Sequence, residues 1–239
     1  MKIENAIILA AGRGSRMREL TNDKPKCMSE INNRSIIQRT IETLKYKNIN
    51  NIIVVTGYKS EILRRHLESI NDSIKIIENK DWEKTNSIAS MKLALQYLKN
   101  SIVIDSDICI LNRDIIRTDI DFSGYSALKE FKPNEWQLKI DRKNGFIEEV
   151  MKSGDYEKAL PIIDISYWTE KDSNIIAERI SSMDLTDEKA AQRFWDEIPL
   201  FDCLHQLKLR RYDICSYDAM EFDTPEELKK VREALCLAD

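Results

Sequence analysis

A short apolar run near the start of the chain breaks into a glycine-rich turn that carries positive charge. Ile7-Ile8-Leu9 leads through two alanines into Gly12-Arg13-Gly14-Ser15-Arg16, and Lys26 lies further along. Glycine lets the backbone approach an anion closely, backbone N–H groups can surround a phosphate, and arginine and lysine neutralise its charge. A tight strand-to-helix turn with solvated basic residues is the structural alternative, and a bare Gly-x-Gly favours neither. The turn is therefore a candidate phosphate-binding loop whose assignment depends on the rest of the chain.

The turn follows the first of several runs that are typical of buried strands. These apolar, β-branched runs lie at 3–10, 51–56, 74–78 and 101–105. Apolar residues recur at helical spacing between them, at 35–44, 61–70 and 86–98. This alternation predicts a parallel sheet covered by helices on both faces, with ligands beyond the carboxyl ends of its strands. Both the glycine-rich turn and Asp107 fall at such ends.

The pattern changes after about residue 125. Strands are expected at 126–130, 137–141, 146–151, 161–168 and 212–216, and helices at 171–182 and 187–208. Thr224 starts a last helix, because Pro225 suits the first helical position and Glu227 completes a capping box. No linker interrupts the chain, so we expect residues 1–239 to form one α/β domain. Its predicted architecture is a Rossmann-like, mostly parallel sheet with helices on both faces and an antiparallel insertion over the cleft.

The composition of the chain indicates which ligands and which cellular compartment to expect. The net charge of -4 gives no global basic signature for nucleic acid, so local charge must hold any anionic ligand. The five cysteines are widely spread without a Cys-x-x-Cys pair, and there are only two histidines. This favours reduced thiols in the cytoplasm over a zinc site or a disulfide framework. The N-terminus has a strand pattern rather than that of a signal peptide, and no apolar run is long enough to span a bilayer.

The run Leu9-Ala10-Ala11-Gly12-Arg13-Gly14-Ser15-Arg16-Met17, followed by Pro25-Lys26, resembles the signature of the nucleotidyltransferases. These enzymes join a nucleoside triphosphate to a phosphorylated small molecule. Further blocks resemble the branch formed by the bacterial CTP:phosphocholine cytidylyltransferases and their relatives: Gly57-Tyr58, Asn79 with Asn86-Ser87 and Ser90, Asp105-Ser106-Asp107, Asn134-Glu135-Trp136 and Glu221-Phe222-Asp223. Asp164 departs from this branch, whose members often have a glycine there, and an acid at that position could alter the acceptor pocket.

The resemblance covers nearly the whole chain and implies a nucleotide-diphospho-sugar transferase-like fold. It divides the domain into a nucleotide-binding half, 1–124, and an acceptor-binding half, 125–239. The implied reaction is Mg²⁺-dependent transfer of CMP from CTP to a small amine-bearing phosphate or phosphonate, with release of pyrophosphate. Phosphocholine, phosphoethanolamine and 2-aminoethylphosphonate are acceptors of this kind. Such a nucleophile is already an anion and needs no general base, so the site must position the reactants and neutralise charge.

The resemblance also assigns the charged residues. Arg16, with the amides of Gly12 to Ser15, would hold the β- and γ-phosphates, and Lys26 would neutralise the α-phosphate. Asp107 and Asp223 are the expected ligands of Mg²⁺, which prefers carboxylate oxygens, phosphates and water. A helix cap or turn is the alternative for an aspartate at the end of a strand.

Two further sets of residues are implied. The nucleotide-binding set is Leu9, Ala11, Gly12, Arg13, Gly14, Ser15, Asn79, Asn86 and Ser90. Asn79, Asn86 and Ser90 would read cytosine, since an amide can both donate and accept, but Asn86 could equally be a helix N-cap. The acceptor-binding set is Glu135, Trp136, Asp164, Asp196 and Glu221. Aromatic faces and acids suit an ammonium group, although Trp168 is better explained as core.

Other functions stay open. A sugar-1-phosphate uridylyl- or thymidylyltransferase would use the same loop, but it would need more hydrogen-bonding side chains for sugar hydroxyls. A nucleotide-sensing domain without activity would be expected to lack one of the four charged residues Arg16, Lys26, Asp107 and Asp223, and all are present. The expected partners are CTP and a phospho-acceptor, without nucleic acid or membrane insertion. The identity of the acceptor, a homodimer and a fused domain beyond Asp239 remain undecided by sequence.

Overall fold

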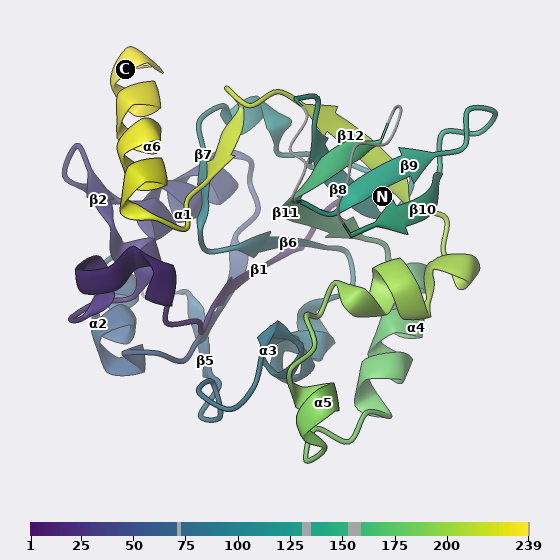
Figure 1. The fold of residues 1–239 in the computed structure, drawn as a ribbon, viewed down its shortest axis with the longest axis horizontal. Coiled ribbons are helices and arrows are strands. Elements are labelled where there is room, and N and C mark those ends of the chain that lie inside the picture. The colour runs from purple at the N-terminus through teal and green to yellow at the C-terminus, as the bar shows by residue number, and fades with distance from the viewer. Residues whose placement is uncertain (71–72, 131–134, 153–158, 239) are drawn as a thin grey trace.

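The computed structural model describes residues 1–70, 73–130, 135–152 and 159–238, with the side chains of 236–238 left aside (Figure 1). Within these residues the largest sheet has nine strands in the order β10-β9-β11-β6-β1-β4-β5, with β8 beside β11 and β12 beside β8. This one sheet runs through both of the halves expected from sequence. The observed architecture is a mixed α/β fold, with a mostly parallel centre surrounded by helices, as predicted.

The parallel part of the sheet contains the strands of the first half of the chain. They are β1 (Asn5–Ala10), β4 (Asn51–Thr56), β5 (Lys75–Glu78) and β6 (Ser101–Asp105). Because alternate side chains of a strand point to opposite faces, each strand contributes to two separate cores. Ile8 packs with residues of α1 (Ile36–Tyr46) and α2 (Ser60–Ile70) on one face. Ile7 and Leu9 pack on the other face with α3 (Ser87–Ala94) and α4 (Glu170–Ser181).

The second half of the chain extends this sheet with antiparallel pairings beside β6. The long strand β11 (Leu160–Trp168) pairs antiparallel with β6, β8 (Gly124–Leu128) and β9 (Gln137–Ile140). At the edges, β10 (Ile147–Met151) pairs antiparallel with β9, and β12 (Arg210–Ile214) returns to the sheet parallel to β8. The change from parallel to antiparallel pairing therefore falls between β6 and β11, next to Asp105.

The prediction of one long helix over 187–208 is wrong. This segment contains only α5 (Glu188–Ala191), a π-helical turn at Ile198–Asp202 and a 3₁₀ turn at Leu204–Gln206. Pro199 has no N–H to continue an α-helical ladder, and the amide of Cys203 instead bonds the carbonyl of Ile198 at 2.9 Å. The irregular segment buries Trp195 completely while leaving Phe201 partly exposed.

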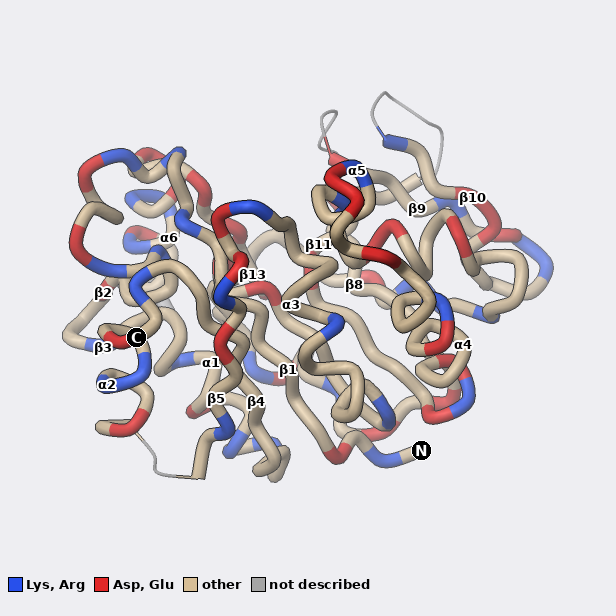
Figure 2. Tube along the Cα trace, turned by 90° about the horizontal axis from the view of Figure 1, so that it is seen from below, with Lys and Arg blue, Asp and Glu red and all other residues tan. Residues whose placement is uncertain are grey.

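Two short antiparallel pairs, which carry little local signal, complete the fold. One joins β2 (Glu30–Ile31) to β3 (Arg34–Ser35), and the other joins β7 (Ile108–Ile110) to β13 (Ala219–Glu221). The last helix, α6 (Pro225–Ala238), starts after the predicted Thr224 cap. In the described part of the chain, no helix combines the length and apolar character needed to cross a bilayer. Lys and Arg positions are intermixed with Asp and Glu over the periphery in Figure 2.

Candidate active site

The glycine-rich loop after β1 has the backbone geometry that its sequence suggests. Gly14 has a φ of 65° and a ψ of 48°, in the left-handed region where glycine carries little penalty. A Cβ on Gly14 would also lie 3.0 Å from Cβ of Lys26, so Lys26 packs directly on this glycine. A Cβ on Gly12 would meet nothing within 4 Å. The loop thus has a packed side toward Lys26 and an open side at Gly12.

Four charged side chains from distant parts of the sequence meet beside this loop. Nζ of Lys26 lies 2.8 Å from Oδ2 of Asp107 and 2.7 Å from Oδ1 of Asp223. Arg16 contacts the other oxygen of Asp223 at 2.6 Å, and its side chain is 71% exposed. The Lys26 side chain is only 8% exposed. Burial alone would lower the pKa of Lys26, but Asp107 and Asp223 raise it above its ordinary value. Lys26 is therefore a charged ammonium at physiological pH.

The short β7–β13 pair explains how Asp107 and Asp223 meet. Glu221 lies opposite Ile108 in this pair, and the amide of Phe222 bonds the carbonyl of Asp107 at 3.2 Å. The capping box of α6 then fixes the backbone beyond it. Oε2 of Glu227 accepts hydrogen bonds from the amides of Asp223 at 2.8 Å and Thr224 at 3.0 Å. The start of the last helix thus positions the Asp223 carboxylate against Lys26.

The same acids form a candidate metal site. Carboxylate oxygens of Asp107, Glu221 and Asp223 lie within 4.8 Å of one another. Oδ1 of Asp107 is buried and has no hydrogen-bond partner among the described residues. Oxygen ligands of this kind fit Mg²⁺, which also keeps water and substrate phosphates as ligands. Glu221, expected from sequence on the acceptor side, is placed with the two predicted metal ligands.

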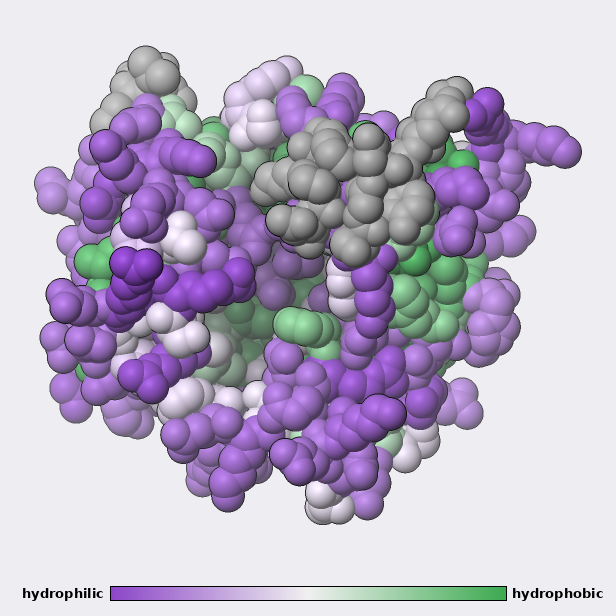
Figure 3. All heavy atoms as spheres, in the orientation of Figure 1, coloured by the Kyte–Doolittle hydropathy of each residue, from purple (hydrophilic) through white to green (hydrophobic). Residues whose placement is uncertain are grey.

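A cleft of about 310 Å³ opens over these residues. Figure 3 shows the face of the molecule in the view of Figure 1, with apolar and weakly polar residues reaching the surface near its centre among hydrophilic ones. Twelve residues predicted for catalysis, nucleotide or metal line the cleft: Leu9, Ala11, Gly12, Gly14, Ser15, Arg16, Lys26, Asn79, Asn86, Ser90, Asp107 and Asp223. Arg13 does not line it, since its guanidinium lies 5.7 Å from the ring centre of Tyr58. The structure thus brings the glycine-rich loop and the two predicted metal ligands, Asp107 and Asp223, into one cavity.

The cleft also contains residues that sequence reasoning missed. Trp82, Thr85, Ser87 and Phe194 belong to its lining. Trp82 packs edge-on against Tyr58, with ring centres 5.2 Å apart. Tyr58 in turn donates a hydrogen bond at 2.6 Å to the carbonyl of Thr21, which ties the extended loop to β4. A tryptophan within the polar stretch 79–85 was the available signal, because a large aromatic in such a loop needs a partner.

The three residues expected to read the base are held by hydrogen bonds. Nδ2 of Asn79 donates to Oγ of Ser90 at 3.1 Å and to Oγ1 of Thr85 at 3.3 Å, while its Oδ1 accepts from the amide of Asp81. Asn86 is the N-cap of α3, as the alternative interpretation predicted, with Oδ1 accepting from the amide of Ser87 at 2.7 Å. These contacts fix the wall of the cleft at which a base would lie.

The aromatic residues of the predicted acceptor pocket lie outside the lining of the cleft. Trp136 is half-buried and packs edge-on against Phe194 and Phe201, and Nζ of Lys152 lies 5.5 Å from its ring centre. Trp168 and Trp195 are buried, as expected for Trp168. Glu135 is half-buried, and Asn134 of the same motif lies outside the described residues.

Three aspartates form an acidic group beside the cleft. Asp105 lines the cleft, Asp164 lies on β11, which pairs with the strand of Asp105, and Asp196 is buried just before the π-helical turn. Burial, and then the nearby carboxylates of Asp164 and Asp107, raise the pKa of Asp105 well above its usual range. Burial, and then Asp196 and Glu221, do the same to the pKa of Asp164. Burial also raises the pKa of Asp196 to about 7, against the opposing effect of the hydrogen bond from Tyr125.

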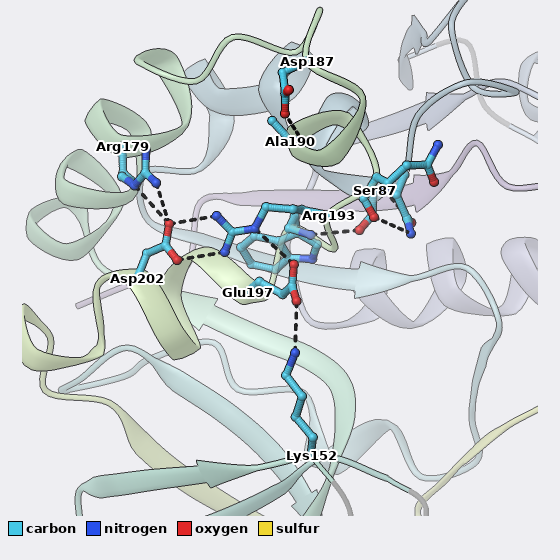
Figure 4. A network of polar contacts seen from close by, with 11 residues as sticks. Ser87, Lys152, Arg179, Asp187, Ala190, Arg193, Glu197 and Asp202 are labelled. Atoms are coloured by element: carbon cyan, nitrogen blue, oxygen red, sulfur yellow. Dashed lines mark hydrogen bonds and ion pairs between the residues drawn. The ribbon is translucent and has the colours of Figure 1, made fainter.

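The irregular segment that carries Asp196 is fixed by an ion-pair network (Figure 4). The guanidinium of Arg193 donates to both oxygens of Asp202, at 2.8 and 2.9 Å, and its Nε donates to Glu197 at 3.1 Å. Lys152, at the end of β10, reaches Glu197 at 3.4 Å. These residues flank Asp196 on both sides in sequence, so the network stabilises the segment that carries Asp196.

The fold and this site define the class of protein. A model of the nucleotidyl transferase family matches residues 5–140, more than half of the 239 residues, and the chain belongs to that family. The match covers the glycine-rich loop, Lys26 and Asp107.

Comparisons over nearly the full length of the chain include several cytidylyltransferases. The chain is 32% identical, over 97% of both chains, to a choline-phosphate cytidylyltransferase of Haemophilus influenzae. It is 27% identical to a 2-aminoethylphosphonate cytidylyltransferase of Lancefieldella rimae, over 94% of this chain and 90% of that protein. The solved CTP:phosphocholine cytidylyltransferase of Streptococcus pneumoniae superposes with a TM-score of 0.87, at 28% identity, over 98% of this chain and 100% of that one. These findings confirm the resemblance identified from the motifs.

Proposed function

We propose that the protein transfers CMP from CTP to a small amine-bearing phosphate or phosphonate, releasing pyrophosphate. The observation that carries the proposal is Lys26, buried beneath the glycine-rich loop and bonded to both Asp107 and Asp223. The cytidylyltransferases among its relatives support CTP as the donor. The product is a CDP-activated compound from a phosphate, or a CMP-activated compound from a phosphonate.

Each protein group has a defined task in this reaction. An acceptor oxygen, already anionic, attacks the α-phosphorus of CTP, the bond to the β-phosphate oxygen breaks, and pyrophosphate leaves with its electron pair. Arg16 and the amides of the glycine-rich loop hold the β- and γ-phosphates, and Lys26 neutralises the α-phosphate together with the incoming oxygen. Removing one such donor costs about 3 kcal/mol of transition-state stabilisation.

Asp107, Asp223 and Glu221 would hold a magnesium ion. When bound, this ion supplies positive charge to the phosphates. The ion would share the carboxylates of Asp107 and Asp223 with the ammonium of Lys26, which contacts both. Lys26 also lines the cleft, so its ammonium would contribute charge to a phosphate bound there.

The acceptor's amine is assigned to the acidic group of Asp105, Asp164 and Asp196. An ammonium there is attracted by carboxylates that lack a cationic partner among the described residues. Its phosphate would then extend toward Lys26, because Asp105 and Lys26 line the same cleft.

The test is pyrophosphate release with Mg²⁺ and each of CTP, UTP, dTTP and ATP, across a panel of phospho-acceptors. The panel includes phosphocholine, phosphoethanolamine, 2-aminoethylphosphonate and glucose 1-phosphate. We expect release with CTP and an amine-bearing acceptor. Release with UTP or dTTP and glucose 1-phosphate, but none with CTP, would show a sugar-1-phosphate nucleotidyltransferase instead.

A further inference from the structure

We propose that the acceptor carries a primary ammonium group, bound by hydrogen bonds to Asp105, Asp164 and Asp196, and that a quaternary ammonium is a poor substrate. This inference rests on the proposed function and specifies the acceptor for the same site. A primary ammonium has three N–H donors, whereas a trimethylammonium has none and is bound by open aromatic faces.

Sheet register places two of the carboxylates side by side. In the antiparallel pair of β11 with β6, Ile165 lies opposite Ile104, so the next step brings Asp164 opposite Asp105. Directly opposite side chains point to the same face, with Cβ atoms about 5 Å apart. Like charges at this spacing repel each other. A cation between them removes that repulsion.

The third carboxylate reaches the same face from another element. Tyr125 on β8 lies opposite Ser166 on β11 and belongs to the core on one face of the sheet. Ile163 and Ile165 belong to the core on the other face, so the intervening Asp164 points to the face of Tyr125. The hydroxyl of Tyr125 donates to Oδ1 of Asp196 at 2.7 Å. Asp196 is thereby fixed toward the sheet face that carries the other two acids.

This group has acceptors for N–H donors but no cation of its own within the described chain. Oδ1 of Asp105 is buried without a hydrogen-bond partner. Among the described residues, the salt bridges of the lysines and arginines go to other acids, and none reaches Asp105, Asp164 or Asp196. Buried acids without donors are costly, and a bound ammonium with several N–H groups relieves that cost.

The three indoles considered for the acceptor pocket, Trp136, Trp168 and Trp195, do not form an open cage for a quaternary ammonium. Trp168 and Trp195 are 0% and 1% exposed and pack edge-on against each other. Trp136 packs edge-on with Phe194 and Phe201, and the ammonium of Lys152 lies over its ring, 5.5 Å from the ring centre. These three indoles therefore pack against other side chains, whereas Oδ1 of Asp105 has no hydrogen-bond partner among the described residues.

The test is a series of acceptors that differ only in N-methylation. The specificity constant, kcat/KM, is measured by CTP-dependent pyrophosphate release with phosphoethanolamine, its N-methyl derivative and phosphocholine. We expect a fall of about 100-fold from the primary to the quaternary ammonium, because the latter leaves buried acceptors unpaired. The wild-type protein alone decides this point, so a variant that fails to fold cannot obscure it.

A variant then assigns the preference to Asp164. Asp164→Asn should lower kcat/KM for phosphoethanolamine at least tenfold and kcat/KM for phosphocholine by a clearly smaller factor, flattening the series, while the exposed Asp114→Asn should leave the series unchanged. Equal or better use of phosphocholine by the wild type, or an equal loss of the whole series in Asp164→Asn, would overturn the inference. Neither result touches the proposed function, which fails instead if CTP gives no pyrophosphate with any amine-bearing acceptor.

Discussion

Nζ of Lys26 lies 2.7 Å from Oδ1 of Asp223, although the two residues are 197 positions apart in the sequence. Asp107 contacts the same nitrogen from the end of another strand, so a buried ammonium joins both acids. The charges of the candidate catalytic centre are therefore balanced within the protein before substrate arrives. This balance makes the stability of the site and its activity depend on the same residues.

Replacing Lys26 with Met should lower the stability of the protein and make that stability more dependent on Mg²⁺. Without the ammonium, Asp107 and Asp223 are partly buried acids without their main counter-charge, so we expect a loss of a few kcal/mol in the free energy of unfolding in EDTA. Mg²⁺ should restore more stability to this variant than to the wild type, because it supplies the missing positive charge. Thermal unfolding with and without Mg²⁺ measures both effects.

The matched control is Lys47→Met, since Lys47 forms an ion pair with the exposed Asp114. That variant should lose at most about 1 kcal/mol and show no additional response to Mg²⁺. Equal melting temperatures for Lys26→Met and Lys47→Met in EDTA would contradict the proposed charge balance.

The two glycines of the loop should respond differently to alanine. Gly14→Ala places a side chain at a φ of 65° and against Lys26, so it should lose about 1–2 kcal/mol of stability. Gly12→Ala has open space around its new methyl group and should keep the stability of the wild type. Its methyl group instead occupies the space in which the triphosphate is expected, so the KM for CTP should rise. Chemical denaturation and CTP kinetics of both variants check this, and an unchanged KM in Gly12→Ala would argue against phosphate binding there.

Asp196 should make the stability of the substrate-free protein depend on pH. Its pKa is about 7 in the folded state and about 3.9 in the unfolded chain. Between these values the folded state keeps a proton that the unfolded state has lost, so this contribution to stability falls as the pH rises from about 4 to 7. Relative to the wild type, Asp196→Asn should therefore gain at least about 1 kcal/mol between pH 5 and pH 7.5. Urea denaturation at the two pH values measures this gain, and identical pH dependence in both proteins would rule out the titration.

Arg193 should stabilise the irregular segment more than Arg179 does. Its guanidinium bonds both oxygens of Asp202, a geometry that lysine cannot reproduce. Arg193→Lys should cost about 1–2 kcal/mol of unfolding free energy and lower kcat/KM for the acceptor, because Asp196 lies within the segment. Arg179→Lys is the comparison, since Arg179 also contacts Asp202 but its side chain is 44% exposed. Equal losses in the two variants would show that the bidentate contact carries no special weight.

Local sequence patterns predicted the strands that have continuous β-branched runs and the helix that has a capping box. The strands at Asn51–Thr56 and Ser101–Asp105 were predicted with the observed bounds, because continuous β-branched runs identify buried strands. The last helix followed from Thr224 and Glu227, whose hydrogen bonds confirm the capping box. The resemblance likewise identified most of the cleft lining, because a phosphate-binding loop depends on residues close together in sequence.

The parts that sequence did not predict depend on distant contacts. The β7–β13 pair, whose strands have three residues each, is long-range and has no local signature, yet it brings Glu221 to Asp107. Helical spacing over 187–208 concealed the break at Pro199, where tertiary packing of Trp195 prevails over local propensity. Trp82 lines the cleft and packs against Tyr58, and no sequence motif predicted this contact.

The role of Asp107 in nucleotidyl transfer is tested most directly by the rate of pyrophosphate release by Asp107→Asn with CTP, Mg²⁺ and an amine-bearing acceptor. The substitution keeps the shape of the side chain and removes the charge that faces Lys26 and the candidate metal site. Asp114→Asn is the control for removal of a surface carboxylate. We expect a loss of at least about 100-fold in Asp107→Asn and none in the control. A rate in Asp107→Asn equal to that of the wild type would contradict it.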